Sequence, residues 1–209
     1  MKIAVIGANG MVGSRAIAEA VGRSHEVDAY SRKGNDVHGA TGYSLDATNT
    51  TELVQVINSH DATIIATAGR DQSDESMKNL HSQLIAAAPS GRLIVVGGAG
   101  ALENSEGERF YNTPDFPEEY RSEAKKFGGI LDDYRENASM LKWTMLAPAF
   151  VIAPGVRTGL YFESKDTPAG GFVSAEDFAV ALIDEAVAPK HMRERFTVAS
   201  QDEETAQGK

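Results

Sequence analysis

The feature that most constrains the fold is a glycine-rich loop that begins at residue 7. An apolar run, Ile3-Ala4-Val5-Ile6, leads directly into Gly7-Ala8-Asn9-Gly10-Met11-Val12-Gly13, and a segment of helical period follows to about residue 21. In a strand–loop–helix unit of this kind the first glycine permits a tight turn, the second lets the backbone approach a pyrophosphate, and the third lets the helix pack closely on the strand. The free N–H groups at the start of the helix favour an anion. The loop therefore predicts dinucleotide contacts at Gly7, Asn9, Gly10, Met11, Val12 and Gly13.

The rest of the chain favours this interpretation over the alternative of a purely structural turn. Short apolar runs alternate with longer stretches of helical period, which is typical of βαβ units and a parallel sheet. The expected strands lie at 3–6, 27–30, 42–45, 62–66, 93–96, 143–147 and 196–199. The expected helices lie near 11–21, 49–59, 73–88, 117–139 and 174–189, with Asn49 and Ser174 as N-caps. We expect Gly128-Gly129 to kink or break the fourth helix, and the polar tail at 201–209 to fray.

Length and composition limit the class of protein. The 209 residues are expected to form a single domain. The net charge of −10 argues against nucleic acid or an anionic membrane as a partner. Cysteine is absent and the five histidines show no pairing one helical turn apart, so no metal site is expected. The apolar run at the N-terminus is shorter than a secretory signal core of about 7–15 residues, and the protein is therefore predicted to be cytoplasmic.

Two long stretches without clear periodicity follow predicted strands. They span residues 97–117 and 150–172, and they contain the aromatic residues Phe110, Tyr111, Phe150 and Tyr161. Loops of this length in a compact domain are usually functional or disordered. The carboxyl ends of parallel strands are also where open α/β sheets bind ligands. Both stretches are therefore expected on the substrate side of the domain.

The residues about 20 positions beyond the glycine loop indicate which dinucleotide binds. An acid there bonds the ribose 2′-hydroxyl of NAD, whereas an arginine accommodates the 2′-phosphate of NADP. The chain has Ser31, Arg32 and Lys33 at this place. They favour NADP(H) over NAD(H), with two exposed surface cations as the alternative. Asp28 is the only acid nearby, and it is expected inside the strand rather than at its end.

Two further places are assigned to the cofactor. Asp46 and Ala47 follow the third predicted strand, and Ala68 and Gly69 follow the fourth. The Asp46 carboxylate is suited equally to accepting a hydrogen bond from the adenine amino group and to capping its own turn. Both roles stay open at this point.

Several other segments occur in an order that is shared with a known family. They are Ile64-Ile65-Ala66, Val95-Val96-Gly97-Gly98-Ala99-Gly100, Trp143-Thr144-Met145-Leu146-Ala147-Pro148-Ala149, Pro154-Gly155-Val156-Arg157-Thr158-Gly159 and Ser174-Ala175-Glu176-Asp177-Phe178-Ala179. Together with the glycine loop and Arg32, this series resembles the atypical short-chain dehydrogenase/reductases over nearly the whole chain. The most similar group is the NAD(P)H-binding, NADH-flavin-reductase-like set, which includes biliverdin reductase B and, more distantly, the NmrA-like proteins.

The resemblance implies both a fold and a place for the substrate. It implies an α/β Rossmann fold, a doubly wound parallel sheet of about seven strands with a small C-terminal substrate lobe. The implied strand order is 3-2-1-4-5-6 plus a seventh strand. It also implies a substrate pocket over the nicotinamide, with Pro148, Ala149 and Phe150 against the carboxamide.

The usual proton donor of the short-chain dehydrogenases is missing. Active members place a lysine four residues after a tyrosine, which lowers the tyrosine pKa, and a serine or threonine after the fifth strand. Neither Tyr120 nor Tyr134 has a lysine at that spacing, and Gly98-Ala99 occupies the place of the serine. Tyr161 with Lys165 is the one formal match, and it lies in a region predicted to be strand and loop.

A flavin reductase does not need this donor. Hydride passes from the nicotinamide to the flavin, and the acceptor takes its proton from solvent. The sequence therefore favours an NAD(P)H-dependent reductase of flavin, quinone or a similar small planar acceptor. Phe110, Tyr111, Phe150 and Tyr161 are candidate stacking residues, with loop packing as the alternative. Arg157 is expected either to bind an acidic group of the substrate or to form a surface ion pair.

Two other functions stay open. One is a non-catalytic, NmrA-like sensor that binds NADP(H) and presents its acidic surface to a regulatory protein partner. The other is an enzyme with its own proton donor, for which Tyr161 and Tyr111 are the catalytic candidates. The sequence leaves homo-oligomerisation undecided.

Overall fold

The computed structural model describes residues 1–67 and 74–209. Within these ranges eight strands form one central sheet in the order β3-β2-β1-β4-β5-β6-β10-β8. The strands are β1 (Lys2–Ile6), β2 (Glu26–Ser31), β3 (Thr41–Ser44), β4 (Ala62–Ile65), β5 (Arg92–Val96), β6 (Lys142–Ala147), β8 (Tyr161–Ser164) and β10 (Arg195–Ser200). Neighbours are parallel except that β8 runs antiparallel to β10. The carboxyl ends of the parallel strands therefore share one edge of the sheet.

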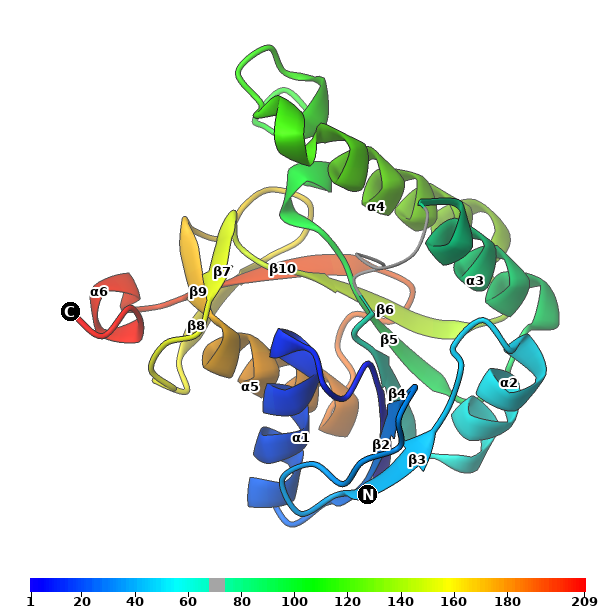
Figure 1. Ribbon diagram of the computed structural model, residues 1–209. Coiled ribbons are helices and arrows are strands. Elements are labelled where there is room, and N and C mark those ends of the chain that lie inside the picture. Colours follow the sequence, from blue (N-terminus) through cyan, green and yellow to red (C-terminus); the bar gives the residue numbers. More distant parts are fainter. Residues whose placement is uncertain (68–73) are drawn as a thin grey trace.

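Helices cover both faces of the sheet (Figure 1). On one face α1 (Met11–Gly22) and α5 (Ala175–Val187) pack against each other, and α2 (Thr50–Ser59), α3 (Asp74–Ala87) and α4 (Glu118–Asn137) cover the other. This is the doubly wound arrangement of the Rossmann fold, so the predicted fold class is confirmed. None of the helices in the described ranges has both the length and the apolar character needed to cross a membrane.

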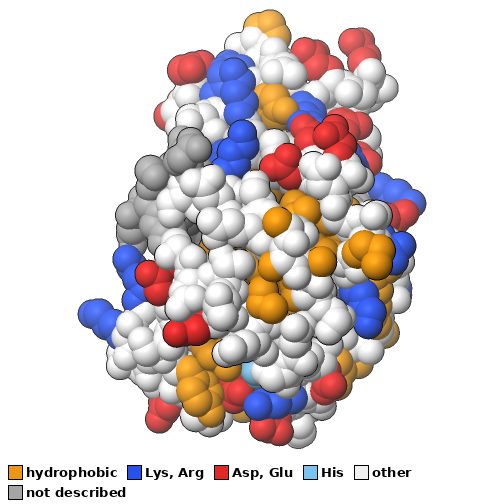
Figure 2. All heavy atoms as spheres, turned by 90° about the vertical axis from the view of Figure 1, so that its right-hand side faces the viewer, with side chains coloured by type: hydrophobic (Ala, Val, Ile, Leu, Met, Phe, Trp, Pro, Cys, Tyr) orange, Lys and Arg blue, Asp and Glu red, His pale blue; other side chains and the backbone are white. Residues whose placement is uncertain are grey.

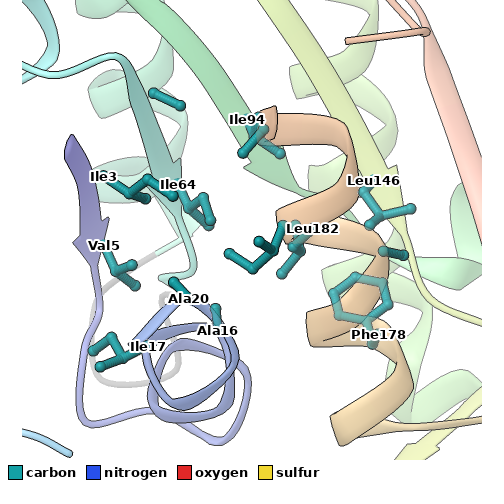
Figure 3. Close-up of a cluster of buried hydrophobic side chains, with 14 of the residues drawn as sticks. Ile3, Val5, Ala16, Ile17, Ala20, Ile64, Ile94, Leu146, Phe178 and Leu182 are labelled. Carbon is teal, nitrogen blue, oxygen red and sulfur yellow. The ribbon is translucent and has the colours of Figure 1, made fainter. Parts of the chain in front are cut away.

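The core consists of two buried clusters, one on each side of the sheet. One cluster fills the interface between the sheet and the helices α1 and α5, and it includes Ile3, Val5, Ala16, Ile17, Ala20, Ile64, Ile94, Leu146, Phe178 and Leu182 (Figure 3). The alternate strand residues face α2, α3 and α4, among them Ile6, Ile65, Leu93, Val95 and Met145. Side chains of a strand point alternately to its two faces, so strands buried on both faces are almost continuously apolar. This double burial holds the strand ends, and the loops that leave them, in fixed positions.

Charged side chains of both signs share the surface. Figure 2 shows the right-hand side of Figure 1, where Lys and Arg side chains are intermingled with Asp and Glu side chains. Apolar side chains are exposed near the centre of the same face.

The second predicted loop contains strands that are not among the seven expected ones, although strand structure was predicted around Tyr161. β7 (Val151–Ala153) pairs with β9 (Phe172–Ser174) in a separate two-stranded sheet, and β8 adds an eighth strand where about seven were expected. β8 forms because the carboxyl end of β10 offers a free edge, with Ser200 opposite Tyr161 and Thr197 opposite Ser164. A four-residue strand is too short to show a readable alternation in the sequence. The segment 150–172 is therefore partly sheet.

The predicted break in α4 is wrong, because the helix is continuous across Gly128-Gly129. A Cβ at Gly128 would lie 2.7 Å from Cε1 of Tyr111. The glycine thus lets the Tyr111 ring pack directly on the helix backbone. This contact offsets the weak helix propensity of glycine, which is about 1 kcal/mol below that of alanine.

The predicted fraying of the C-terminal tail is also wrong. The tail forms a short helix, α6 (Glu203–Ala206), whose N-cap Asp202 accepts a hydrogen bond from the Thr205 N–H at 3.0 Å. The Glu203 carboxylate accepts from the N–H of Gly171 at 2.8 Å and of Phe172 at 3.1 Å. The tail is ordered because its carboxylate binds the backbone that leads into β9.

Candidate functional site

The glycine loop has the geometry that the sequence predicts. Gly7 adopts a φ of +90°, and a Cβ there would lie 2.7 Å from the carbonyl oxygen of Ala66. A Cβ at Gly13 would lie 2.2 Å from the carbonyl oxygen of Gly7, so only glycine permits this approach of helix to loop. The N–H groups of Gly7 and Ala8 both donate to the carbonyl oxygen of Tyr30, at 3.0 and 3.1 Å. The turn is therefore tied to the carboxyl end of β2.

The first turn of α1 offers backbone donors to a ligand. Gly10 is the N-cap and has no side chain with which to cap the helix. The first N–H groups of an α-helix lack intrahelical acceptors, and here they belong to Met11, Val12 and Gly13. Asn9 is exposed beside them. An anion at this place would meet several N–H groups and the positive end of the helix dipole.

The loop after β2 is held by its own hydroxyl groups. Ser31 Oγ accepts from the Gly34 N–H at 3.1 Å, and Ser44 Oγ donates to the carbonyl oxygen of Arg32 at 3.1 Å. The side chains of Arg32 and Lys33 are exposed at the end of the strand. Two cations thus stand on a backbone that is fixed from both sides.

Asp28 is engaged within the sheet, as its place inside the strand predicted. The residue is 5% exposed, and its carboxylate lies 2.9 Å from His60 Nε2 and 3.0 Å from Lys2 Nζ. A carboxylate held by these two groups is not available to a ribose hydroxyl.

Asp46 caps its own turn, one of the two roles that the sequence left open. Its Oδ1 accepts from the Thr48 N–H at 3.0 Å and from Thr48 Oγ1 at 2.8 Å. These hydrogen bonds lower the pKa of the Asp46 carboxyl. Ala47 packs against the buried cluster on the α2 side. Ala68 and Gly69, assigned to the cofactor from the sequence, lie outside the described residues.

The segment after β5, where the short-chain dehydrogenases have their catalytic serine, packs closely on α4, where they have the tyrosine–lysine dyad. A Cβ at Gly98 would lie 2.6 Å from Cδ2 of Phe127. A Cβ at Gly100 would lie 2.6 Å from the Cβ of Ala124. The short 3₁₀ helix η1 (Ala99–Ala101) therefore packs tightly on α4. A side chain at Gly98 or Gly100 would not fit here unless α4 or its side chains moved.

Tyr161 does not form the alternative dyad. Its hydroxyl donates to Asp184 Oδ2 at 2.8 Å, while Oδ1 of Asp184 lies 2.6 Å from Arg23. Asp184 lies near the carboxyl end of α5 and Arg23 follows the carboxyl end of α1, whereas the glycine loop precedes the start of α1. Burial and the Asp184 carboxylate raise the Tyr161 pKa, and Lys165 pairs with Glu194 at 3.0 Å. Tyr161 and Lys165 are thus bonded to other residues, and these contacts do not support a catalytic or substrate-binding role for Tyr161.

Arg157 forms the surface ion pair that was the alternative to substrate binding. Its Nε and Nη2 donate to the two oxygens of Glu19 in α1, at 2.7 and 2.9 Å. The same carboxylate accepts from Arg23 Nε at 2.7 Å. The two arginines lower the pKa of Glu19. The guanidinium of Arg157 is therefore already paired within the chain.

Asp177 is a key residue that sequence reasoning missed. It is fully buried in the first turn of α5, and Oδ1 accepts from the N–H groups of Thr158 and Gly159, both at 2.8 Å. Oδ2 accepts from Thr158 Oγ1 and from Ser200 Oγ, both at 2.7 Å. Asp177 thus fastens the loop after β7 to the end of β10. Its place three residues after the N-cap Ser174 was the available signal, but that spacing suggests only a helix cap.

The sequence-predicted aromatic residues Phe110 and Phe150 come together. They form an edge-to-face pair with ring centroids 4.8 Å apart, and Phe150 is 44% exposed. Phe110 belongs to the 3₁₀ helix η2 (Phe110–Asn112) in the first loop, and Phe150 closely follows β6. Just before Phe150, Ala149 is fully buried and Pro148 O accepts from Thr197 Oγ1 at 3.2 Å. We call this pair the aromatic pair.

Tyr111 has a different environment from Phe110. Its hydroxyl accepts from Arg109 Nη1 at 2.8 Å, and the same nitrogen donates to Asp132 at 2.8 Å. The ring packs on α4 at Gly128. Loop packing, the alternative for the aromatic residues, thus describes Tyr111.

Two more aromatic residues of these segments also differ in environment, since one is packed and the other is exposed. Phe116 packs against Gly100, beneath the guanidinium of Arg121. Phe162 on β8 is 51% exposed.

Comparison with known proteins establishes the family. A model of the NAD(P)H-binding family matches residues 7–189. The chain belongs to this family. It is 34% identical to the uncharacterised protein YwnB of Bacillus subtilis over 214 residues, covering 97% of this chain and 100% of YwnB. The family resemblance inferred from the sequence is confirmed.

Two solved structures are closely similar in fold to this chain. A protein of Streptococcus pneumoniae described as a "putative NADH-flavin reductase" is 31% identical, with a TM-score of 0.84, over 96% of this chain and 100% of that one. A "putative epimerase" of Bacteroides thetaiotaomicron is 32% identical, with a TM-score of 0.82, over 95% and 96% of the two chains. The solved structures to which this chain is similar are thus assigned to different reactions.

Proposed function

We propose that the protein is an NADPH-dependent reductase that transfers hydride directly to a flavin, a quinone or a similar planar acceptor. The observation that carries this proposal is the aromatic pair Phe110–Phe150, in which Phe150 is 44% exposed beside the end of β6. The glycine loop follows the carboxyl end of β1, at the same edge of the sheet as the end of β6. A dinucleotide and a planar acceptor could then meet above the carboxyl ends of the strands.

The chain's own residues suit NADP(H). In the proposed complex, the first-turn N–H groups of α1 bind the pyrophosphate, and Arg32 with Lys33 binds the 2′-phosphate. The engagement of Asp28 by His60 and Lys2 supports this choice, because that acid does not compete for a ribose hydroxyl. When bound, the nicotinamide supplies the hydride.

The acceptor site needs an aromatic side chain that stacks on the acceptor ring, and it needs to exclude water, but it does not need a proton donor. Phe150 orients the acceptor ring, and Phe110 holds the Phe150 ring through their edge-to-face contact. The buried Ala149 closes the base of the site against water. The packing of η1 on α4 in place of a catalytic dyad favours an acceptor that takes its proton from solvent over the reaction of an epimerase. The flavin reductase assignment of the S. pneumoniae relative points the same way.

Steady-state oxidation of NADPH, with NADH in parallel, tests the proposal. FMN, riboflavin and a soluble quinone serve as acceptors, on protein already shown to bind the cofactor. Turnover well above the uncatalysed rate, and faster with NADPH, is the expected result. Tight cofactor binding without turnover on any of these acceptors would refute the reductase and support the sensor instead.

A further inference from the structure

Arg195 is an unusual residue for the middle of a sheet. It lies at the start of β10, opposite Met145 of β6, and is only 2% exposed. Burial lowers its pKa, which means that the charged form is held at an energetic cost. A buried guanidinium persists only when its N–H groups are well partnered. The partners of Arg195 therefore show what the charge is used for.

Both predicted substrate-side loops supply those partners. Nε and Nη2 of Arg195 donate to Asp166 Oδ1, at 2.8 and 2.5 Å, in the segment that follows β8. Nη1 donates to the carbonyl oxygen of Ala101, at 2.5 Å, in the segment that follows β5. The two segments also bond directly, because the Glu103 N–H donates to the carbonyl oxygen of Asp166 at 2.8 Å. One side chain thus joins β10 to both loops.

The first of these segments carries Phe110. Glu103 bridges to Arg109 in an antiparallel pairing, and the Phe110 N–H donates to the carbonyl oxygen of Leu102 at 2.9 Å. Phe110 is therefore fixed to the backbone that Arg195 holds at Ala101. Phe150 closely follows β6, the strand that pairs with β10 at Arg195. The guanidinium consequently links the two backbones whose separation sets the Phe110–Phe150 contact.

We propose, on the basis of the reductase function proposed above, that Arg195 is a positioning residue for the acceptor. Together with Asp166 it holds the hairpin at 101–110 against β10, so that the aromatic pair keeps the spacing at which it binds a planar ring. Neither residue belongs to the glycine loop or to the loop after β2, so binding of the pyrophosphate and of the 2′-phosphate is not expected to depend on this ion pair.

Two variants separate this role from general stability. In Arg195→Lys the single ammonium cannot reach Asp166 and Ala101 together, because it lacks the planar fork of the guanidinium. In Asp166→Asn an oxygen acceptor remains but the charge is lost, so this milder variant is expected to stay folded. The matched control is Arg92→Lys at the start of β5. Arg92 is also buried, and its Nη2 pairs with the buried Glu185 at 2.6 Å, at the amino end of the sheet.

The experiment measures KM for riboflavin and for NADPH in each variant. It also measures the Kd for riboflavin, in the presence of NADP+, from quenching of riboflavin fluorescence. For Arg195→Lys and Asp166→Asn the expected result is a rise of about fivefold to tenfold in both riboflavin constants, the size of a lost aromatic contact. The NADPH constant should stay within about twofold of that of the unchanged protein, and Arg92→Lys should alter neither ligand.

Each other outcome overturns the proposal. Parallel weakening of riboflavin and NADPH, or an equal effect of Arg92→Lys, would show that Arg195 acts through stability alone. Unchanged riboflavin constants in folded variants would show that the ion pair does not position the acceptor. Failure of the proposed function looks different, because the unchanged protein would then bind riboflavin without oxidising NADPH. If it neither binds riboflavin nor turns over, both proposals fall.

Discussion

Replacement of Asp177 by alanine should destabilise the protein by about 3–5 kcal/mol. The residue is fully buried, and its carboxylate accepts hydrogen bonds from two N–H groups and two hydroxyl groups of Thr158, Gly159 and Ser200. Hydrogen bonds to a charged group contribute about 1.5–3 kcal/mol each. The sum is reduced because Thr158 and Gly159 are half-buried, so their freed N–H groups can reach water. The expected loss matches that found when one partner of a buried charge is removed, about 3–5 kcal/mol.

Asp177→Asn is the matched control, and it should destabilise by only about 1 kcal/mol. Its remaining oxygen can accept from the two backbone N–H groups, and its amide group would face two hydroxyls. A hydroxyl accepts as readily as it donates, and Thr158 Oγ1 already lies 3.2 Å from the carbonyl oxygen of Leu160, to which it can turn its proton. Hydrogen bonding can therefore be restored without the charge.

Urea unfolding followed by circular dichroism measures both variants against the unchanged protein. The expected order of stability is unchanged protein, then Asn, then Ala, with the larger step between Asn and Ala. Equal losses for the two variants would refute the reasoning, since the charge rather than the hydrogen bonds would then hold the loop. A loss below about 1 kcal/mol for alanine would show that the four contacts together contribute little.

Three other measurements test the site and the fold. Arg32→Ala should weaken NADPH binding by about 1–3 kcal/mol, the contribution of a charge-assisted hydrogen bond, and should leave NADH binding nearly unchanged. Calorimetric titration with both cofactors measures this difference, and equal weakening of NADPH and NADH binding would rule out a role for Arg32 in binding the 2′-phosphate. Tyr161→Phe should keep NADPH oxidation within about twofold, since the hydroxyl is bonded to Asp184; loss of turnover would restore Tyr161 as a proton donor. Burial lowers the pKa of His81 to about 4, against about 6.5 in an unfolded chain, so protonation of His81 favours unfolding. The contribution of neutral His81 to the free energy of unfolding is therefore complete above pH 6.5 and is lost as the pH falls toward 4. Unfolding free energies at pH 7.5 and 5 should show about 2 kcal/mol of this loss, and His81→Gln, which cannot titrate, should remove that part of the pH dependence.

The sequence by itself determined the features that depend on residues close together in the chain. The positive φ of Gly7 and the approach of Gly13 to Gly7 follow from backbone sterics within one loop, and Asn49 and Ser174 cap their helices through the N–H group three residues ahead. The alternation of apolar runs also determined the doubly wound sheet. Such features were predictable because the same few residues decide them in any context.

Short or locally ambiguous segments were not predictable in this way. β8 forms because β10 offers a free edge on the side away from β6, and Tyr111 packs on α4 at Gly128, where the helix continues through two glycines. The polar tail looked free, but Glu203 bonds to the backbone of the segment that leads into β9. In each case the deciding contact comes from another part of the chain.

Only the tertiary structure decided how the charged and aromatic side chains are used. A guanidinium suits a phosphate and a carboxylate equally well, and Arg157 binds Glu19, 138 positions away, instead of a substrate. The hydroxyl of Tyr161 meets Asp184, and Arg195 meets Asp166 and Ala101. The physical reason is that these interactions act over about 3 Å, and only the folded chain decides which groups come within that distance.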